Sequence, residues 1–200
     1  MTPPSRPRGG LPVINAPTVG GGYRDAMLKL LRPIAVALAL LAGACVTTNQ
    51  PPLAGTFVLR PAMQQRLNPA VLNIQQATHH ALGDDGRIDP SRLDAGQWQQ
   101  LALGAEQLAA LGHDMAAARD FIAAPPDNAE VRTGEPPMAE VQWKIDRDPY
   151  LFRQMSAAMA THADKLAAAA RARDGAATRS LLARTDAVCA SCHARFWRPD

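Results

Sequence analysis

Cysteine is scarce in this chain, which contains only three cysteines among 200 residues. Cys189 and Cys192 lie three positions apart, and the third cysteine is Cys45. A structural zinc site usually takes its ligands from two pairs of similar spacing, and the chain has no second pair of cysteines. A thioredoxin-like dithiol is also disfavoured, because the sequence shows no alternation of strands and helices around the two cysteines.

Aromatic residues are also rare, at 4% of a chain that is 47% hydrophobic. Most of the apolar residues are therefore alanine and leucine, and β-branched strand formers are few. This composition favours helices over sheets. The length fits one domain together with a targeting segment. We therefore expect an all-α domain.

The main part of the chain lacks an excess of positive charge. The formal net charge is +3, but residues 1–44 hold five positive residues and only one negative residue. Of the 21 positive and 18 negative residues in the chain, 16 and 17 remain downstream, which is a net charge of −1. The basic balance belongs to the N-terminal segment, so no nucleic-acid-binding surface is indicated.

No apolar run is long enough to span a bilayer comfortably. The run Ile34–Leu41 has instead the short length that is typical of a cleaved export signal. Lys29 and Arg32 supply the positive charge that precedes such a run, and small residues follow it. We therefore predict a signal peptide over residues 27–44.

Residues 1–26 are rich in proline and glycine and show no hydrophobic periodicity. Met27 opens a much better export signal than Met1 does. Residues 1–26 are therefore predicted to be a disordered or mis-assigned N-terminal extension, with the true start at Met27.

Cys45 lies at the predicted cleavage point. The stretch LAGAC that ends there resembles a bacterial lipobox, in which the cysteine is acylated and becomes the mature N-terminus. The alternative is cleavage after Ala44 that leaves an unpaired thiol, a liability in an exported protein. We favour the lipoprotein, and Val46 is compatible with the outer membrane. Residues 45–56 are then a lipid-anchored tether, and residues 57–200 are the folded domain.

Apolar residues recur at helical spacing in four segments. The predicted helices cover about 60–82, about 94–123, a stretch from Pro149 to the break at Asp174-Gly175, and about 176–196. Short outer connections and one long middle connection are typical of an antiparallel four-helix bundle. That bundle is the expected fold.

Three details of these helices can be checked. Pro69 should kink the first helix. The second helix carries Ile122 on its apolar stripe and should be stopped by Pro125-Pro126. Within the polar connection 127–148, we expect Trp143 to pack on the core, on a short helix.

The most informative motif is Cys189-Ala190-Ser191-Cys192-His193, the pattern of covalent c-type haem attachment. Residues i, i+3 and i+4 share one face of a helix, so both cysteines and His193 should point the same way. Two thioethers then hold the porphyrin edge, and the imidazole serves as axial ligand of the iron. We predict one haem c, attached through Cys189 and Cys192 and ligated by His193.

A four-helix domain with this motif at its C-terminal end resembles the class II c-type cytochromes, the family of cytochrome c′ and cytochrome c-556. The resemblance covers about residues 57–198. In class I cytochromes the motif lies near the N-terminus and a methionine ligand follows it, whereas no methionine follows His193 here. Met63, six residues before Pro69, is similar to one branch of the family. Trp197 stands where many cytochromes c′ carry a proximal Arg or Lys, so a mechanism that needs this cation is not expected.

The resemblance places the sixth ligand on the first helix, where Met63 is the only methionine. Its thioether would give six-coordinate, low-spin iron suited to electron transfer. The alternative is a core methionine that fills space beside the macrocycle.

The other histidines are weaker candidates. His79 and His80 lie off the apolar stripe and should face solvent, as should His113. His162 shares a face with two methionines and is expected to be a core histidine, with contact to the haem pocket as the alternative. Two arginines lie one turn on either side of Met63 and could pair with haem propionates, although surface charge is the default. They are Arg60 and Arg66.

Together these features predict a periplasmic, outer-membrane-anchored monohaem cytochrome that carries one electron and is not an enzyme. The expected partner is a redox protein, and cytochromes c′ commonly form homodimers. One alternative is a five-coordinate haem protein that binds nitric oxide or carbon monoxide. Another is a structural lipoprotein in which the C-x-x-C-H motif is a coincidence.

Overall fold

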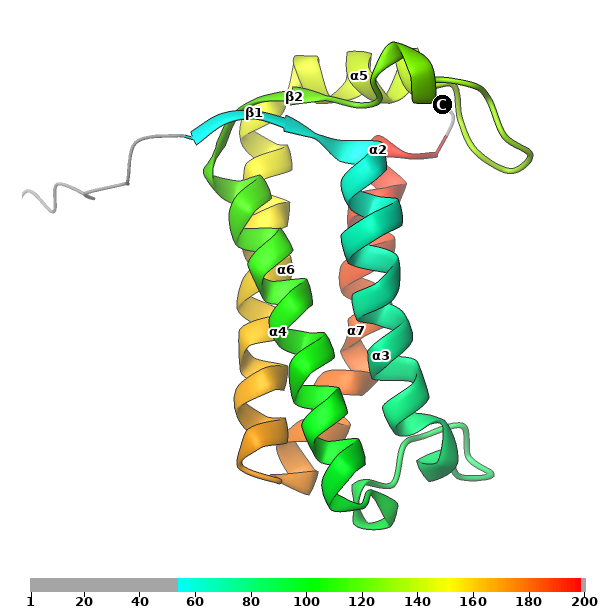
Figure 1. Cartoon of the computed structure of the whole chain (residues 1–200), viewed down its shortest axis with the longest axis vertical. Coiled ribbons are helices and arrows are strands. Elements are labelled where there is room, and N and C mark those ends of the chain that lie inside the picture. Colours follow the sequence, from blue (N-terminus) through cyan, green and yellow to red (C-terminus); the bar gives the residue numbers. More distant parts are fainter. Residues whose placement is uncertain (1–53, 199–200) are drawn as a thin grey trace, which may run out of the picture. The chain divides into compact units, whose positions relative to one another are not determined.

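The computed structural model describes residues 54–198, and this part of the chain is mostly helical, as predicted (Figure 1). Its long helices are α3 (Asn68–Thr78), α4 (Ala95–Ala117), α6 (Pro149–Arg171) and α7 (Gly175–Phe196). Shorter helical elements are α2 (Leu59–Ala62), η2 (Met63–Leu67), η3 (His79–Ala81), η4 (Pro90–Arg92), η5 (Pro126–Asn128) and α5 (Met138–Arg147). The strands are β1 (Ala54–Val58) and β2 (Ala118–Ile122).

The predicted extension 1–26, signal peptide 27–44 and lipidation site Cys45 lie outside the described residues. The predicted tether over 45–56 overlaps the described part only from Ala54, where the chain already forms β1. The tether prediction is therefore wrong for its last residues, which belong to the folded domain. Between residues 54 and 198, no helix combines the length and the apolar character needed to cross a membrane.

The first helical segment runs from Leu59 to Ala81 through several kinds of helix. Its π-helical turn η2 spans Met63–Leu67, and the N–H of Asn68 donates to the carbonyl of Met63, five residues back. Pro69 follows directly, in the first turn of α3. Proline has no N–H, and in an α-helix its ring clashes with the carbonyl four residues earlier. The wider π turn lies where this misfit would arise. The kink predicted at Pro69 stays a prediction.

Helix α4 starts as predicted but ends early. The Asp94 carboxylate accepts the N–H of Gln97 and the Gln97 side chain accepts the N–H of Asp94, both at 2.8 Å, which is a capping box. The helix stops at Ala117, and residues 118–122 form β2, which pairs in parallel with β1. The prediction that Ile122 continues the apolar stripe of this helix is wrong, because Ile122 lies on the strand and is exposed.

The third and fourth predicted helices are confirmed. Asp148 caps α6 by accepting the N–H of Leu151 at 3.0 Å. Asp174 caps α7 by accepting the N–H of Ala177 at 3.0 Å. The short helix predicted in the polar connection is α5, but the prediction for Trp143 is wrong. Its side chain is half exposed, with the guanidinium carbon of Arg147 4.6 Å from the ring centroid.

Buried side chains form two core clusters. The first core cluster includes Ala70, Ile74, Trp98, Leu101, Leu108 and Leu166. The second core cluster includes Leu111, Met115, Phe121, Ile145, Phe152 and Phe196. Helix α4 packs closely along α6 and α3, and α7 packs along α6, whereas α3 and α7 approach each other much less closely.

Helix α6 ends on a left-handed residue that is not glycine. Arg173 has a φ of 52°. Its N–H donates to the carbonyl of Ala170 at 3.0 Å, and the N–H of Asp174 donates to the carbonyl of Ala169 at 2.9 Å. These paired hydrogen bonds define a Schellman motif, whose left-handed position is usually glycine.

We expect the substitution Arg173→Gly to stabilise the protein. A residue with a Cβ pays about 1 kcal/mol for the left-handed conformation, so the free energy of unfolding should rise by about that amount. Urea denaturation followed by circular dichroism would measure it. The matched variant Arg173→Ala keeps the Cβ and should show no such gain. An equal gain from both variants would assign the effect to the lost arginine side chain instead.

Candidate functional site

The C-x-x-C-H motif lies in the last turns of α7. Cys189 and Cys192 are free thiols, and both are partly buried. Cys192 packs against the second core cluster. His193 is exposed, and its ring centroid lies 6.1 Å from that of Trp197. The helix therefore places the two thiols along its buried edge and the imidazole beside them on the solvent side.

Three aromatic rings fix the end of α7. The ring of Phe196 packs edge-on against Phe152 of α6, with centroids 5.1 Å apart. Phe152 packs in the same way against Phe121 of β2, at 4.8 Å. Such edge-to-face pairs stabilise a core beyond their buried area. The motif is thus held by contacts to α6 and β2, which no local sequence pattern indicates.

Helix α5 fastens the chain directly after the motif. The N–H groups of Trp197 and Arg198 donate to the carbonyl of His193 at 2.9 and 3.0 Å. The buried ammonium of Lys144 donates to the carbonyl of Arg198 and lies 3.0 Å from the carboxylate of Glu140. Lys144 therefore connects the C-terminal end of α7 to α5.

Both thiols are held in the neutral form. Burial raises the pKa of Cys192 to about 11, and the neighbouring Cys189 adds to the shift. Burial also raises the pKa of Cys189, with a further contribution from Asp186. A reactive dithiol needs the opposite, a lowered pKa that exposes a thiolate. The environment of this pair therefore differs from that of a redox-active dithiol.

Met63 lies on the π turn η2, partly buried against the second core cluster that Cys192 also contacts. Met155 and Met159 of α6 pack on the same cluster. The structure thus brings Met63 and the end of the motif to one group of apolar and sulfur-containing side chains. Ligation by Met63 stays a prediction.

The histidines expected at the surface are found there. His79 and His80 are exposed, as predicted. His113 is also exposed, and its Nε2 lies 2.8 Å from the carboxylate of Asp164. These three side chains therefore lie on the outside of the domain, away from the core clusters.

His162 is partly buried between α6 and α7. Its Nε2 lies 3.1 Å from Oγ1 of Thr185, one turn before Cys189. Burial lowers its pKa, and the nearby cations of Arg184 and Lys165 lower it further. A hydrogen-bonded, neutral imidazole supports the interpretation of His162 as a core histidine.

The two arginines beside Met63 have partners within the chain. Arg60 is only 4% exposed, donates to the carbonyls of Asn128 and Glu130 at 2.7 Å, and pairs with the carboxylate of Glu135. The default of a surface charge is therefore wrong for Arg60, which ties the loop after β2 to the start of α2. Arg66 is exposed and pairs with Asp114 of α4, which agrees with a surface charge.

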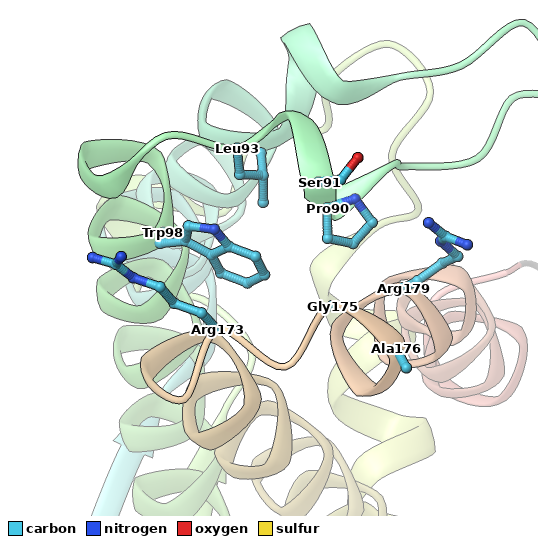
Figure 2. A pocket seen from close by; sticks show the side chains of 8 residues that line it. All are labelled: Pro90, Ser91, Leu93, Trp98, Arg173, Gly175, Ala176 and Arg179. Atoms are coloured by element: carbon cyan, nitrogen blue, oxygen red, sulfur yellow. The ribbon is translucent and has the colours of Figure 1, made fainter.

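A separate pocket of about 480 Å³ lies at the other end of the helices, between η4 and the turn from α6 to α7 (Figure 2). Trp98 and Arg173 line one side of it, and Pro90 and Arg179 line the other. Arg179 is held by the carboxylate of Asp89 at 3.2 Å. No residue of the C-x-x-C-H motif lines this pocket, so it is distinct from the candidate site.

Within residues 54–198, no three His, Cys, Asp or Glu side chains gather closely enough to hold a metal ion by themselves. Comparisons with protein-family models, with curated proteins and with solved structures give no match. The interpretation of the site therefore rests on its own residues.

Proposed function

We propose that this chain is a monohaem c-type cytochrome of the class II kind and that it carries one electron. The observation that carries the proposal is the C-x-x-C-H motif on α7, and it is supported by the packing of both Cys192 and Met63 against the second core cluster. Cys189 and Cys192 would hold the porphyrin through thioether bonds, and His193 would ligate the iron. When bound, the haem supplies a reversible change between ferrous and ferric iron.

The residues around the motif fit this group. The thiols share the buried edge of α7, and the side chains beside Cys192 are apolar or carry soft thioethers. We further propose that α3, α4, α6 and α7 form an antiparallel four-helix bundle, in which cofactor sites are commonly built from facing helices.

The chain's own residues would act by holding and shielding the iron. Phe196 and Lys144 fix the end of α7, so His193 would keep its position in both redox states. The apolar second core cluster would exclude water from one side of the group. Met63 would provide the sixth ligand, and a thioether raises the potential compared with a second imidazole. We propose no catalytic acid, base or nucleophile, and hence no enzyme activity.

The absorption spectrum of the protein, made in a periplasm with haem-ligation machinery, tests this function. We expect a sharp reduced α-band, the mark of six-coordinate, low-spin iron. Met63→Leu should convert the spectrum to high spin because it removes the thioether. Met159→Leu removes another methionine at the same cluster and should leave the α-band unchanged.

Each other outcome has a definite meaning. A wild-type protein that is already high spin would contradict ligation by Met63 and would favour the binding of nitric oxide or carbon monoxide. An unchanged spectrum in Met63→Leu would make Met63 a packing residue. No haem signal at all would contradict both haem functions.

We also propose that the protein is exported to the periplasm and anchored in the outer membrane through acylated Cys45. The signal over 27–44 and the LAGAC stretch support this location. Its partner would then be another redox protein of the same compartment. The mass of the mature N-terminal peptide distinguishes an acylated Cys45 from simple cleavage after Ala44.

A further inference from the structure

Helix α5, the start of α6 and strand β2 carry two exposed aromatic residues and three arginines, and these elements lie at the end of the domain where β1 begins (Figure 1). Trp143 of α5 is 50% exposed, and Tyr150 of α6 is 61% exposed. The guanidinium carbon of Arg147 lies 4.6 Å from the Trp143 ring centroid, and Arg153 follows Tyr150 by one turn of α6. We call these residues, together with Arg119, the aromatic patch. It comprises Arg119, Trp143, Arg147, Tyr150 and Arg153.

Contacts along the chain connect this patch to the start of β1. Ala54 pairs with Ala118 of β2, and the carbonyl of the next residue, Arg119, accepts a hydrogen bond from Arg153 at 3.3 Å. Arg153 follows Tyr150 by one turn of α6. The patch and the entry of the chain into the fold therefore share one end of the domain (Figure 1).

Helix α5 is tied to the same end. The Gln142 side chain accepts the N–H of Ala123 at 2.7 Å and donates to the carbonyl of Phe121 at 3.0 Å. Trp143 is the next residue on this helix. Ile122 of β2 adds an apolar side chain that is 42% exposed. The half-exposed rings are thus held by α5, α6 and β2.

Two arginines of the aromatic patch are available to bind lipid phosphate. Arg119 pairs with Asp120 at 2.9 Å. Among residues 54–198, Arg147 and Arg153 have no carboxylate partner, although Asp146 lies beside Arg147 and accepts a hydrogen bond from Gln142 at 2.8 Å. Amphipathic rings beside guanidinium groups are the side chains that settle at the level of lipid headgroups, where arginine binds phosphate.

The tether limits which end of the domain can reach a membrane. Nine residues lead from Cys45 to Ala54, and fully extended they span at most about 30 Å. A 23-residue helix such as α4 is itself about 35 Å long. A lipid on Cys45 would therefore bring to the membrane surface the end of the domain that carries β1 and the aromatic patch. This step rests on the acylation of Cys45 in the proposed function.

We propose that the aromatic patch docks on the phospholipid headgroups of the membrane in which Cys45 is anchored. The C-terminal end of α7 lies at this same end of the domain (Figure 1). The candidate site is therefore held near the membrane surface, and the pocket beside Trp98 faces away from it.

The test measures membrane binding by the aromatic patch in a chain that carries no lipid anchor. Cys45→Ser removes the acylation site, and the small residues Ala42-Gly43-Ala44 allow ordinary signal cleavage, so the exported chain carries no lipid. This variant is floated with vesicles of three parts phosphatidylethanolamine and one part phosphatidylglycerol. We expect measurable binding that falls by about tenfold or more when Trp143→Ala and Tyr150→Ala are added.

A matched control is Leu82→Ala in the same Cys45→Ser chain, because Leu82 is 51% exposed at the other end of the domain. It should leave flotation unchanged, and circular dichroism should show all variants folded. No flotation of Cys45→Ser, or equal flotation after loss of both rings, would overturn the proposal and assign the patch to a protein partner. Haem absorbance and the N-terminal mass of the wild type are measured separately, so failure of the haem or of the lipid is distinguished from failure of the docking.

Discussion

Replacing both Cys189 and Cys192 with alanine is expected to abolish the haem that stays on the chain after denaturation. Only a thioether survives unfolding, and these are the only cysteines in the described part of the chain. Each single replacement should keep the pigment through the remaining thioether, with the α-band moved to longer wavelength because one vinyl group stays conjugated. A haem-stained denaturing gel and a spectrum in denaturant measure both effects.

Cys45→Ser is the matched control for this result. It removes the third cysteine, outside the described residues, and should leave the covalent haem at the wild-type level. Haem that persists in the double variant would show attachment by some other group. A wild-type chain without covalent haem would favour the structural lipoprotein with a coincidental motif.

Replacing Gly112 with leucine is expected to destabilise the helices severely. Gly112 is buried where α4 crosses α6, and a Cβ at this position would lie 2.9 Å from both Cβ and N of Ala160. Since Ala160 is fully buried and part of the contact is with backbone, no change of rotamer can relieve the clash. Overpacking costs about 1–3 kcal/mol of the free energy of unfolding, and we expect a loss at the upper end of this range because the clash involves backbone. Urea denaturation followed by circular dichroism measures the loss.

Ala110→Leu supplies the control on the same helix. Ala110 is exposed, so the added leucine meets solvent and the free energy of unfolding should change by less than about 0.5 kcal/mol. A comparable loss from both variants would show that leucine disturbs α4 itself. If Gly112→Leu itself lowers the free energy of unfolding only slightly, α4 and α6 can move apart at little energetic cost, which contradicts the prediction.

Helix boundaries that depend on local chemistry were predictable from the sequence. Asp94, Asp148 and Asp174 each cap the helix that follows, and their side chains bond to N–H groups only three residues away. Caps of this kind are local and recur at fixed spacing. The starts of α4, α6 and α7 therefore lie within a residue or two of the predictions.

Features that depend on distant partners were not predictable. Strand β2 continues directly from α4, and it is a strand because β1, more than 50 positions earlier, pairs with it. Arg60 is buried because carbonyls of Asn128 and Glu130 accept its hydrogen bonds. The prediction for Trp143 was wrong for a related reason. Its aromatic side chain suggested a place in the core, but α5 buries other residues of the helix instead. A single sequence contains no local pattern for such pairings.

The candidate site also has one part that the local sequence predicts and another that depends on distant residues. Helical spacing predicts that both thiols and His193 share one face of α7, and the structure shows the two thiols partly buried and His193 exposed. The groups that hold this end in place, Phe152 and Lys144, come from α6 and α5. Their role depends on how those helices pack, so only the structure identifies them.

The π turn at Met63–Leu67 has a consequence for insertions and deletions. It holds one more residue than an α-helical turn, so side chains before it are rotated by one residue step, about 100°, relative to an uninterrupted helix. Without it, Met63 would line up with Ala70, which lies against Gly104 of α4. With it, Met63 moves toward the side of the half-buried Val71. In a related chain that lacks one residue of this turn, the segment would be a plain α-helix. The methionine would then lie seven positions before the residue equivalent to Val71, and it would still face the same side of the helix as that residue.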